Sequence, residues 1–176
     1  AAREAMEAGA RFNDAASAIQ TRQTIDRQPG RIITERVAKR LLSAYGVPVV
    51  PERVVSSADS AVRAADEFRY PVVMKVDSPD LPHKTEAGVV RLGLRDAQAV
   101  REAFADLTRI VEGMQPRPQV KGILVQPMLP AGLEIMIGAR TDPLFGPLIV
   151  VGLGGILVEL LRDTVVELAP VTTCTL

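Results

Sequence analysis

Residues 70–94, YPVVMKVDSPDLPHKTEAGVVRLGL, hold two apolar runs and the only histidine of the chain. The run from Pro71 to Val76 has the length and composition of a buried strand, and residues 89–94 form a second such run. Two prolines keep the segment between the runs from forming a regular helix or strand. The stretch therefore predicts two strands joined by an irregular loop, and His83 lies on that loop.

The sequence on either side predicts a domain in which helices and strands alternate. Helices are expected at residues 34–46, 57–68 and 96–112, and further strands at residues 47–55, 122–129, 133–139, 147–152 and 164–170. The elements follow no strict repeat, which favours an α/β domain of the α+β type, with helices packed on a mixed, largely antiparallel sheet. The last helix carries its apolar residues on one face: Val100, Phe104, Leu107 and Val111.

Residues 1–30 precede this domain. Their composition is helical to about residue 20, and a polar stretch that ends in Gln28-Pro29-Gly30 follows. Adjacent proline and glycine are typical of turns and linkers. We expect residues 1–30 to be a connector or an N-terminal helix, and residues 31–176 to form a domain that is incomplete at its C-terminus.

The overall composition excludes several classes of function. The 21 Lys and Arg residues balance 21 Asp and Glu residues and aromatic residues make up 3%, so neither nucleic acid nor an anionic membrane surface is an expected partner. The longest apolar run, residues 147–161, is shorter than the roughly 20 residues that cross a membrane. One cysteine, Cys174, and one histidine exclude a disulfide framework and a Cys/His zinc site, which favours the cytoplasm.

A charged residue interrupts the first apolar run, because Lys75 lies between Met74 and Val76. A buried ammonium group needs an anionic partner, since burying it unpaired is costly. Side chains of a strand alternate between its two faces, so a lysine that points outward to solvent is the alternative. The local sequence leaves both interpretations open.

Glycines and acidic residues mark the C-terminal part of the chain. The sequence GLGG at residues 152–155 resembles a phosphate loop, but the fingerprint G-x-G-x-x-G would need glycine at Leu157, so a tight turn after a strand is favoured. Glu134, Glu159 and Asp163 stand among apolar segments. Such carboxylates are either surface residues or ligands that converge on a cation, and taken singly the surface interpretation is favoured.

His83 is followed by the sequence KTEAG at residues 84–88. The neighbouring lysine disfavours metal ligation, because two cations repel each other. The turn supplies a hydroxyl group, backbone N–H groups and a glycine, which together suit a bound phosphate. Neutral imidazole is a competent nitrogen nucleophile. His83 is therefore either a surface loop residue or a nucleophile or proton carrier.

Taken together, these residues resemble the ATP-grasp domain of the ADP-forming acyl-CoA synthetases (acetate–CoA ligases), relatives of succinyl-CoA synthetase. Four blocks, in order over about residues 31–170, carry the resemblance: ERVAKRLLSAYGVPV (35–49), YPVVMKVDSPDLPHKTEAGVVRLGL (70–94), GILVQPMLPAGLEIMIGARTDPLFGP (122–147) and VVGLGGILVELLRDTV (150–165). The resemblance implies an ATP-grasp-like fold with a two-lobed nucleotide site. It also implies an enzyme, an ADP-forming acid–CoA ligase that uses ATP or ADP with Mg²⁺.

The resemblance assigns expected roles to individual residues. Seven of them match positions that bind nucleotide or metal in the family: Lys75 at the ATP phosphates, Gln126, Pro127 and Met128 beside the adenine, Glu134 near the ribose, and Glu159 and Asp163 near the metal and phosphates. His83 matches the phosphohistidine of the family's ATP-grasp domain. That residue takes a phosphoryl group at one site and delivers it to ADP at another, which implies that His83 is catalytic.

The resemblance also implies partners. In the family, CoA-binding and ligase domains, fused to the ATP-grasp region or present as a separate subunit, bind CoA and a small organic acid. We therefore expect the chain to be inactive alone and to act in a homo- or hetero-oligomer. Two departures stand out, because the family has two glycines where this chain has Gly88-Val89, and the family domain continues past residue 170.

A non-catalytic module is the alternative function. Such a domain would sense nucleotide or act as a scaffold in a synthetase-like or acetyltransferase fusion protein. The joint presence of His83, Lys75 and Glu134 favours the enzyme, because a scaffold does not need them.

Overall fold

The computed structural model describes residues 33–155 and 164–171. These residues form three helices and seven strands: α3 (Glu35–Ala44), β1 (Arg53–Val55), α4 (Ala58–Phe68), β2 (Val72–Asp77), β3 (Val90–Leu94), α5 (Ala97–Gly113), β4 (Gly122–Pro127), β5 (Ile135–Asp142), β6 (Gly146–Leu153) and β7 (Thr164–Leu168). Within the described ranges, no helix is both long enough and apolar enough to cross a membrane. The predicted connector, residues 1–30, lies outside the described part.

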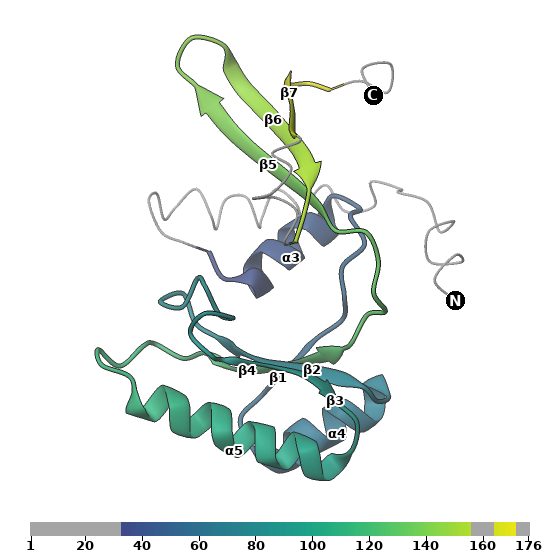
Figure 1. Ribbon diagram of the computed structural model, residues 1–176, viewed down its shortest axis with the longest axis vertical. Helices are drawn as coiled ribbons and strands as arrows, with labels where there is room; N and C mark the ends of the chain where they lie inside the picture. The colour runs from purple at the N-terminus through teal and green to yellow at the C-terminus, as the bar shows by residue number, and fades with distance from the viewer. Residues whose placement is uncertain (1–32, 156–163, 172–176) are drawn as a thin grey trace. The chain divides into compact units, whose positions relative to one another are not determined.

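The chain divides into two compact units between Met128 and Leu129. The first unit contains a four-stranded sheet in the order β1-β4-β2-β3, and the second contains a three-stranded sheet in the order β5-β6-β7. Every strand pair in both sheets is antiparallel. The predicted α/β domain with a largely antiparallel sheet is therefore confirmed (Figure 1).

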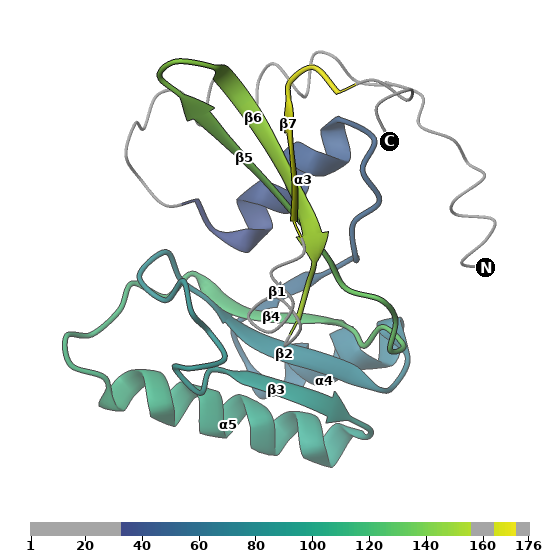
Figure 2. The same cartoon turned by 45° about the horizontal axis from the view of Figure 1, so that its top comes forward.

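Helices α4 and α5 cover one face of the four-stranded sheet, and α3 lies on the other face (Figures 1 and 2). The hydrophobic core fills the space between the sheet and the two covering helices. Its contributors on β2 and α5 are buried residues at alternate strand positions and on one helical face: Val72, Met74, Val76, Val100, Ala103, Leu107 and Val111. The predicted apolar face of α5 is confirmed, although Phe104 is only partly buried.

Side-chain hydrogen bonds mark the beginnings of the two covering helices. Ser57 accepts a hydrogen bond from the backbone N–H of Ser60, and the Ser60 side chain accepts one from the backbone of Ser57, which completes a capping box. Asp96 accepts a hydrogen bond from the backbone N–H of Ala99 at 2.8 Å. These caps pair N–H groups that have no partner within the helix, and they fix the starts of both helices close to the predicted positions.

The strand predicted at residues 47–55 was wrong in length, since only Arg53–Val55 pairs with β4. Pro48 and Pro51 lack a backbone N–H, so this part of the segment cannot supply a full set of ladder hydrogen bonds. The short strand nevertheless approaches its neighbour closely. A Cβ atom at Gly122, whose φ is +143°, would lie 2.5 Å from Val54 Cγ1, so this position requires glycine.

Helix α3 differs from α4 and α5 because none of its residues is buried. Thr34 is the N-cap residue of the helix, although its side chain makes no capping hydrogen bond. Polar side chains join the helix to the sheet: Arg36 Nε donates to Asp77 Oδ2 at 2.8 Å, and Lys75 Nζ donates to Glu35 Oε1 at 2.6 Å. Asp77 is fully buried at the end of β2. Ion pairs thus bring the first turn of α3 against β2.

The second unit is an antiparallel hairpin of β5 and β6 with β7 paired to β6. At the hairpin turn, Asp142 Oδ1 accepts hydrogen bonds from the backbone N–H groups of Leu144 and Phe145, at 2.9 and 3.1 Å. Gly146 follows with φ +81°, a conformation that other residues rarely adopt. Several of the unit's large apolar side chains are exposed, including Ile137 at 72%.

A substitution in the core tests the packing of α5 on the sheet. We expect Leu107→Ala to lower the free energy of unfolding by about 2 to 5 kcal/mol, because the side chain is fully buried and its removal leaves a cavity. Leu92→Ala, at a position that is 66% exposed, should lower it by only about 0.5 kcal/mol. Urea denaturation of both variants measures the two values, and equal losses would contradict the assigned core.

Candidate functional site

A pocket of about 480 Å³ opens on the face of the sheet that α4 and α5 do not cover. It is lined by residues of α3, three strands and the loop between β2 and β3: Glu35, Val73, Lys75, Pro82, His83, Lys84, Thr85, Glu86, Val90, Leu92 and Gln126. The pocket therefore brings together three residues that were singled out separately in the sequence, Lys75, His83 and Gln126.

The alternation of side chains along β2 places Lys75 in this pocket. Val72, Met74 and Val76 belong to the core, so Val73 and Lys75 point to the opposite face. β2 pairs with β3 on one side and β4 on the other, which gives Lys75 a central position in the sheet. Its side chain is only 14% exposed and its ammonium group lies 2.6 Å from a Glu35 carboxylate oxygen. Of the two interpretations left open by the sequence, the structure shows the one with an anionic partner.

Glu35 gathers three ammonium groups around one carboxylate. The Nζ atoms of Lys75 and Lys39 lie 2.6 and 2.9 Å from Oε1, and the Nζ atom of Lys84 lies 3.8 Å from Oε2. Lys39 also forms an ion pair with Glu52 at 2.7 Å and donates a hydrogen bond to Gln126 Oε1 at 3.0 Å. Lys39, Lys75, Lys84, Glu35 and Glu52 therefore form a connected network of three lysines and two carboxylates, which extends from the pocket lining to residues beside it.

This network shifts the titration of its members. Burial raises the pKa of Glu35, but hydrogen bonds from Lys75 and Lys39 and the charges of both lysines outweigh burial and lower the pKa to about 2. Burial lowers the pKa of Lys39, and hydrogen bonds to Glu52 and Glu35 reverse this effect and raise it. At neutral pH the carboxylate of Glu35 is therefore charged, and it holds the lysines by charge-assisted hydrogen bonds.

His83 begins a tight turn on the rim of the pocket. Its side chain is 77% exposed, and its backbone carbonyl accepts a hydrogen bond from the N–H of Ala87 at 3.0 Å. Two further backbone hydrogen bonds close the turn, from Gly88 to Thr85 and from Val89 to Lys84. Not all of the loop is exposed, because Ser78 at its start is buried.

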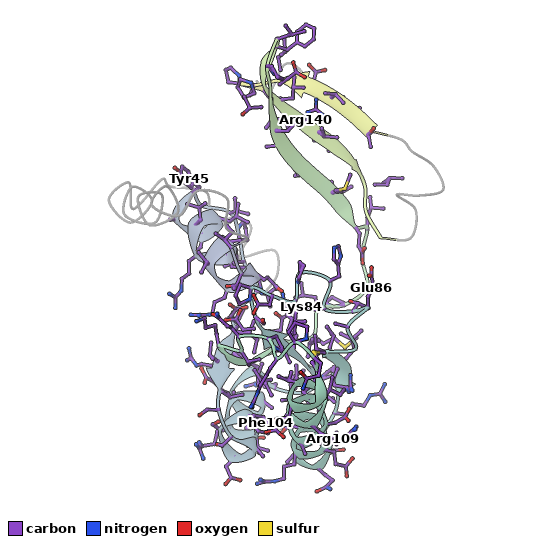
Figure 3. All side chains as sticks on the ribbon, turned by 90° about the vertical axis from the view of Figure 1, so that its left-hand side faces the viewer. Tyr45, Lys84, Glu86, Phe104, Arg109 and Arg140 are labelled. Atoms are coloured by element: carbon purple, nitrogen blue, oxygen red, sulfur yellow. The ribbon has the colours of Figure 1, made fainter. Side chains whose placement is uncertain are left out.

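The turn presents its side chains in two directions. Figure 3 labels Lys84 and Glu86 on this turn, apart from Phe104 and Arg109 on α5. The Lys84 side chain is 14% exposed and lies toward Glu35, whereas the Glu86 side chain is 82% exposed. Gly88 has φ +68°, and Val89 is fully buried in the core. The departure from the family's two glycines therefore falls on a residue that packs inside the protein.

The other predicted site residues lie in different parts of the chain. Gln126 is in β4 beside the pocket, Pro127 ends the strand, and the backbone N–H of Met128 donates to the carbonyl of Pro71 at 3.0 Å. Glu134 precedes β5 and belongs to the second unit. The predicted metal ligands, Glu159 and Asp163, lie outside the described residues.

The GLGG sequence has a local structural role in the second unit. The N–H of Gly154 donates to the carbonyl of Glu134 at 2.7 Å. A Cβ atom on Gly154 would lie 3.0 Å from Cβ of Glu134, and one on Gly155 would lie 2.6 Å from its Oε2. The two glycines therefore allow the backbone to approach Glu134 closely, as the preferred interpretation, a tight turn after a strand, requires.

Within residues 33–155 and 164–171, no three His, Cys, Asp or Glu side chains are grouped closely enough to hold a metal ion. The described residues of the pocket include cationic donors that can hold a phosphate group. Lys75 and Lys84 are two largely buried ammonium groups that face one pocket, and they already hold an anion, the carboxylate of Glu35. A phosphate group, like a carboxylate, presents anionic oxygens that ammonium groups can bind.

The sequence did not identify Glu35 as part of the site. It stands at the start of a helix, where an acidic residue is common for reasons of helix stability alone. Its partner Lys75 is 40 residues away, so the contact follows from tertiary structure. The one local signal is the four-residue spacing to Lys39, with which it forms an ion pair.

Comparison with known protein families gives the family of this domain. The ATP-grasp domain family matches residues 24–175, and the chain belongs to this family. It is an ATP-grasp domain of the kind found in ADP-forming acyl-CoA synthetases. The β subunit of acetate–CoA ligase [ADP-forming] I from Pyrococcus furiosus is 39% identical over 142 residues, which cover 81% of this chain and 61% of the relative. Relatives of this kind are ligases, and they do not favour a non-catalytic module.

Solved structures show the same fold. The dinucleotide-forming acetyl-coenzyme A synthetase 1 of Candidatus Korarchaeum cryptofilum, in complex with coenzyme A and Ca-AMPCP, matches 89% of this chain and 68% of its own chain, with 36% identity and a TM-score of 0.81. A structure of the same enzyme with coenzyme A and Mg-AMPPCP, whose phosphohistidine segment points towards the nucleotide binding site, matches 89% of this chain and 66% of its own, with 33% identity and a TM-score of 0.71.

The lowered pKa of Glu35 predicts a specific dependence of stability on pH. A carboxyl group whose pKa falls from 4.5 to about 2 on folding stabilises the protein fully above about pH 4.5, and this contribution is lost as the pH falls toward 2. Glu35→Gln lacks the titrating group. We therefore expect the difference in unfolding free energy between wild type and variant to shrink from pH 6 to pH 3, as measured by urea denaturation; a constant difference would contradict the ion pairs.

Proposed function

We propose that this pocket binds the phosphate groups of ATP or ADP. The convergence of Lys75 and Lys84 on one pocket, each 14% exposed, is the observation that carries the proposal. Largely buried ammonium groups need an anion, and a polyphosphate supplies several negative oxygens at once. Further support comes from the Korarchaeum structures, which contain the nucleotide analogues Ca-AMPCP and Mg-AMPPCP.

The remaining nucleotide contacts follow as further parts of this proposal. Gln126 lines the pocket, Pro127 ends β4 and Met128 ends the first unit, and we assign these three consecutive residues to the adenine. Glu134 is assigned to the ribose, and Glu159 and Asp163 to Mg²⁺. When bound, Mg²⁺ would neutralise part of the phosphate charge.

His83 is the proposed phosphoryl carrier. In the direction that consumes ATP, a ring nitrogen of His83 forms a bond to the γ-phosphorus while the bond between that phosphorus and the ADP oxygen breaks, and ADP leaves with the electron pair. The reverse transfer from phosphohistidine would make ATP from ADP. Support comes from the high exposure of the His83 side chain on the pocket rim, and from the phosphohistidine segment of the Korarchaeum enzyme.

The chain spans about three fifths of the length of the Pyrococcus furiosus relative. The activity of the whole protein is therefore also a proposal, namely an ADP-forming acid–CoA ligase that interconverts an acyl-CoA with a small organic acid and CoA. We propose that CoA-binding and ligase domains, fused or in a separate subunit, complete it as an oligomer in the cytoplasm. Residues 31–176 would then contribute the ATP-grasp domain, and residues 1–30 a connector to those partners.

Removal of the central lysine tests nucleotide binding. We expect Lys75→Ala to weaken binding of Mg-ATP by about 1.5 to 3 kcal/mol, or roughly 10- to 150-fold, because a charge-assisted contact to phosphate is lost. Isothermal titration calorimetry measures the affinity. Lys121→Ala, which removes the same charge from an exposed position just before β4, is the matched control. Equal affinities of wild type and Lys75→Ala would contradict the proposed phosphate site.

Replacement of the histidine tests phosphoryl transfer. Full-length protein incubated with γ-labelled ATP and Mg²⁺ should acquire a phosphate that is labile in acid and stable in base, as expected of a phosphoramidate. His83→Asn should abolish both this labelling and acyl-CoA formation, because asparagine is polar but has no nucleophilic ring nitrogen.

The same histidine variants should retain binding of Mg-ATP, since His83 acts in the transfer step and contributes little to ground-state affinity. Calorimetry on His83→Asn and His83→Ala separates the two effects. Normal turnover of His83→Asn would contradict the carrier role and would show that His83 is a surface loop residue.

A further inference from the structure

Glu35 occupies the ammonium groups that the proposed ligand would use. Its Oε1 atom lies 2.6 Å from Lys75 Nζ, and its Oε2 atom lies 3.8 Å from Lys84 Nζ. The Glu35 side chain is 31% exposed and lines the same pocket as both lysines. Oε1 thus faces Lys75, together with Lys39, and Oε2 faces Lys84, so the carboxylate spans the two pocket lysines as two oxygens of a phosphate group would.

A carboxylate and a phosphate compete for the same donors. Both are anions, and at the distance of a shared ammonium group their mutual repulsion is large in a partly buried site. The cluster contains three lysines, Lys39, Lys75 and Lys84, and two glutamates, Glu35 and Glu52, so one positive charge is left over. A single excess positive charge cannot balance the several negative charges of a nucleotide's phosphates. Withdrawal of the Glu35 carboxylate would leave more positive charge to balance them.

The position of Glu35 allows such a withdrawal. It lies in the first turn of α3, a helix with no buried residue, so no core packing opposes a change of its rotamer or of the helix end. Lys39 stands one turn further along the helix, 2.9 Å from Glu35 Oε1. Lys39 lies outside the pocket lining, so it can keep Glu35 as a partner when the lysines of the pocket are taken by phosphate.

We propose that Glu35 is an internal competitor of the nucleotide phosphates: its carboxylate pairs with Lys75 and Lys84 and is displaced when a polyphosphate binds. This inference rests on the proposed phosphate site and adds a residue that sets its affinity. Glu35 acts through the lysines, so it is a positioning residue. Its presence keeps the lysines paired without ligand and weakens binding, because the ligand must first break these ion pairs.

The test measures the affinity of the protein for inorganic tripolyphosphate and for Mg-ATP by calorimetry. Glu35→Gln should bind tripolyphosphate about three- to tenfold more tightly than wild type, the range expected for release of a partly buried ion pair. Glutamine has the size of glutamate and can still accept a hydrogen bond from a lysine. A residue with a purely structural role would lose affinity when replaced, so a gain identifies competition.

Two controls separate competition from a general charge effect. Glu86→Gln removes the same charge from the same pocket, but the Glu86 side chain is 82% exposed, so we expect a smaller gain. The double variant Lys75→Ala/Glu35→Gln should show a smaller gain over Lys75→Ala alone, because only Lys84 is then left to be freed. If Glu35→Gln unfolds, Glu35→Asp, whose carboxylate is one methylene shorter, should give a gain in the same direction.

The outcomes distinguish the two proposals. Unchanged or weaker binding of tripolyphosphate by Glu35→Gln, an equal gain in Glu86→Gln, or a gain that is undiminished without Lys75 would overturn the competitor role. The proposed function would fail in a different way, if neither wild type nor Glu35→Gln bound Mg-ATP while both bound tripolyphosphate. In that case a gain in Glu35→Gln would still support the competition for an anion.

Discussion

The alternation of side chains along β2 is the constraint on which the rest of the first unit depends. One strand has to supply the core with Val72, Met74 and Val76 and the pocket with Val73 and Lys75. A shift of one residue in its pairing would bury the lysine among the helices and expose the valines. Pairing with a strand on each side holds the register, because β2 has ladder hydrogen bonds with both β3 and β4.

Local sequence patterns predicted most of the helices and strands. They failed where the outcome depends on strand pairing or on small side chains that an apolar pattern does not register. Helix α5 was predicted at residues 96–112 from its apolar spacing, and the structure begins it at Ala97. The strand predicted at residues 47–55 was too long, because β-rich composition does not show which N–H groups find a partner. The buried Ala103 escaped the prediction of the α5 face, since a small side chain contributes little to an apolar count.

The candidate site was predictable only in part for a related reason. Lys75 stood out because a charge within an apolar strand is costly, and His83 because it lies between prolines and a turn. Their joint position on one pocket was not visible in the sequence, since it depends on how the loop of residues 78–88 folds back beside β2. Glu35 is the extreme case, because its contacts with both lysines of the pocket, Lys75 and Lys84, join residues that are distant in the sequence.

The attachment of α3 has a consequence for the response of the protein to its solvent. Ion pairs and charge-assisted hydrogen bonds join this helix to the sheet, whereas α4 and α5 are held by buried apolar side chains. Dissolved salt screens partly exposed charges over about 8 Å at physiological ionic strength, and it leaves apolar contacts intact or strengthens them. Rising ionic strength therefore loosens one face of the sheet without loosening the other, and the loosened face is the one that forms the pocket.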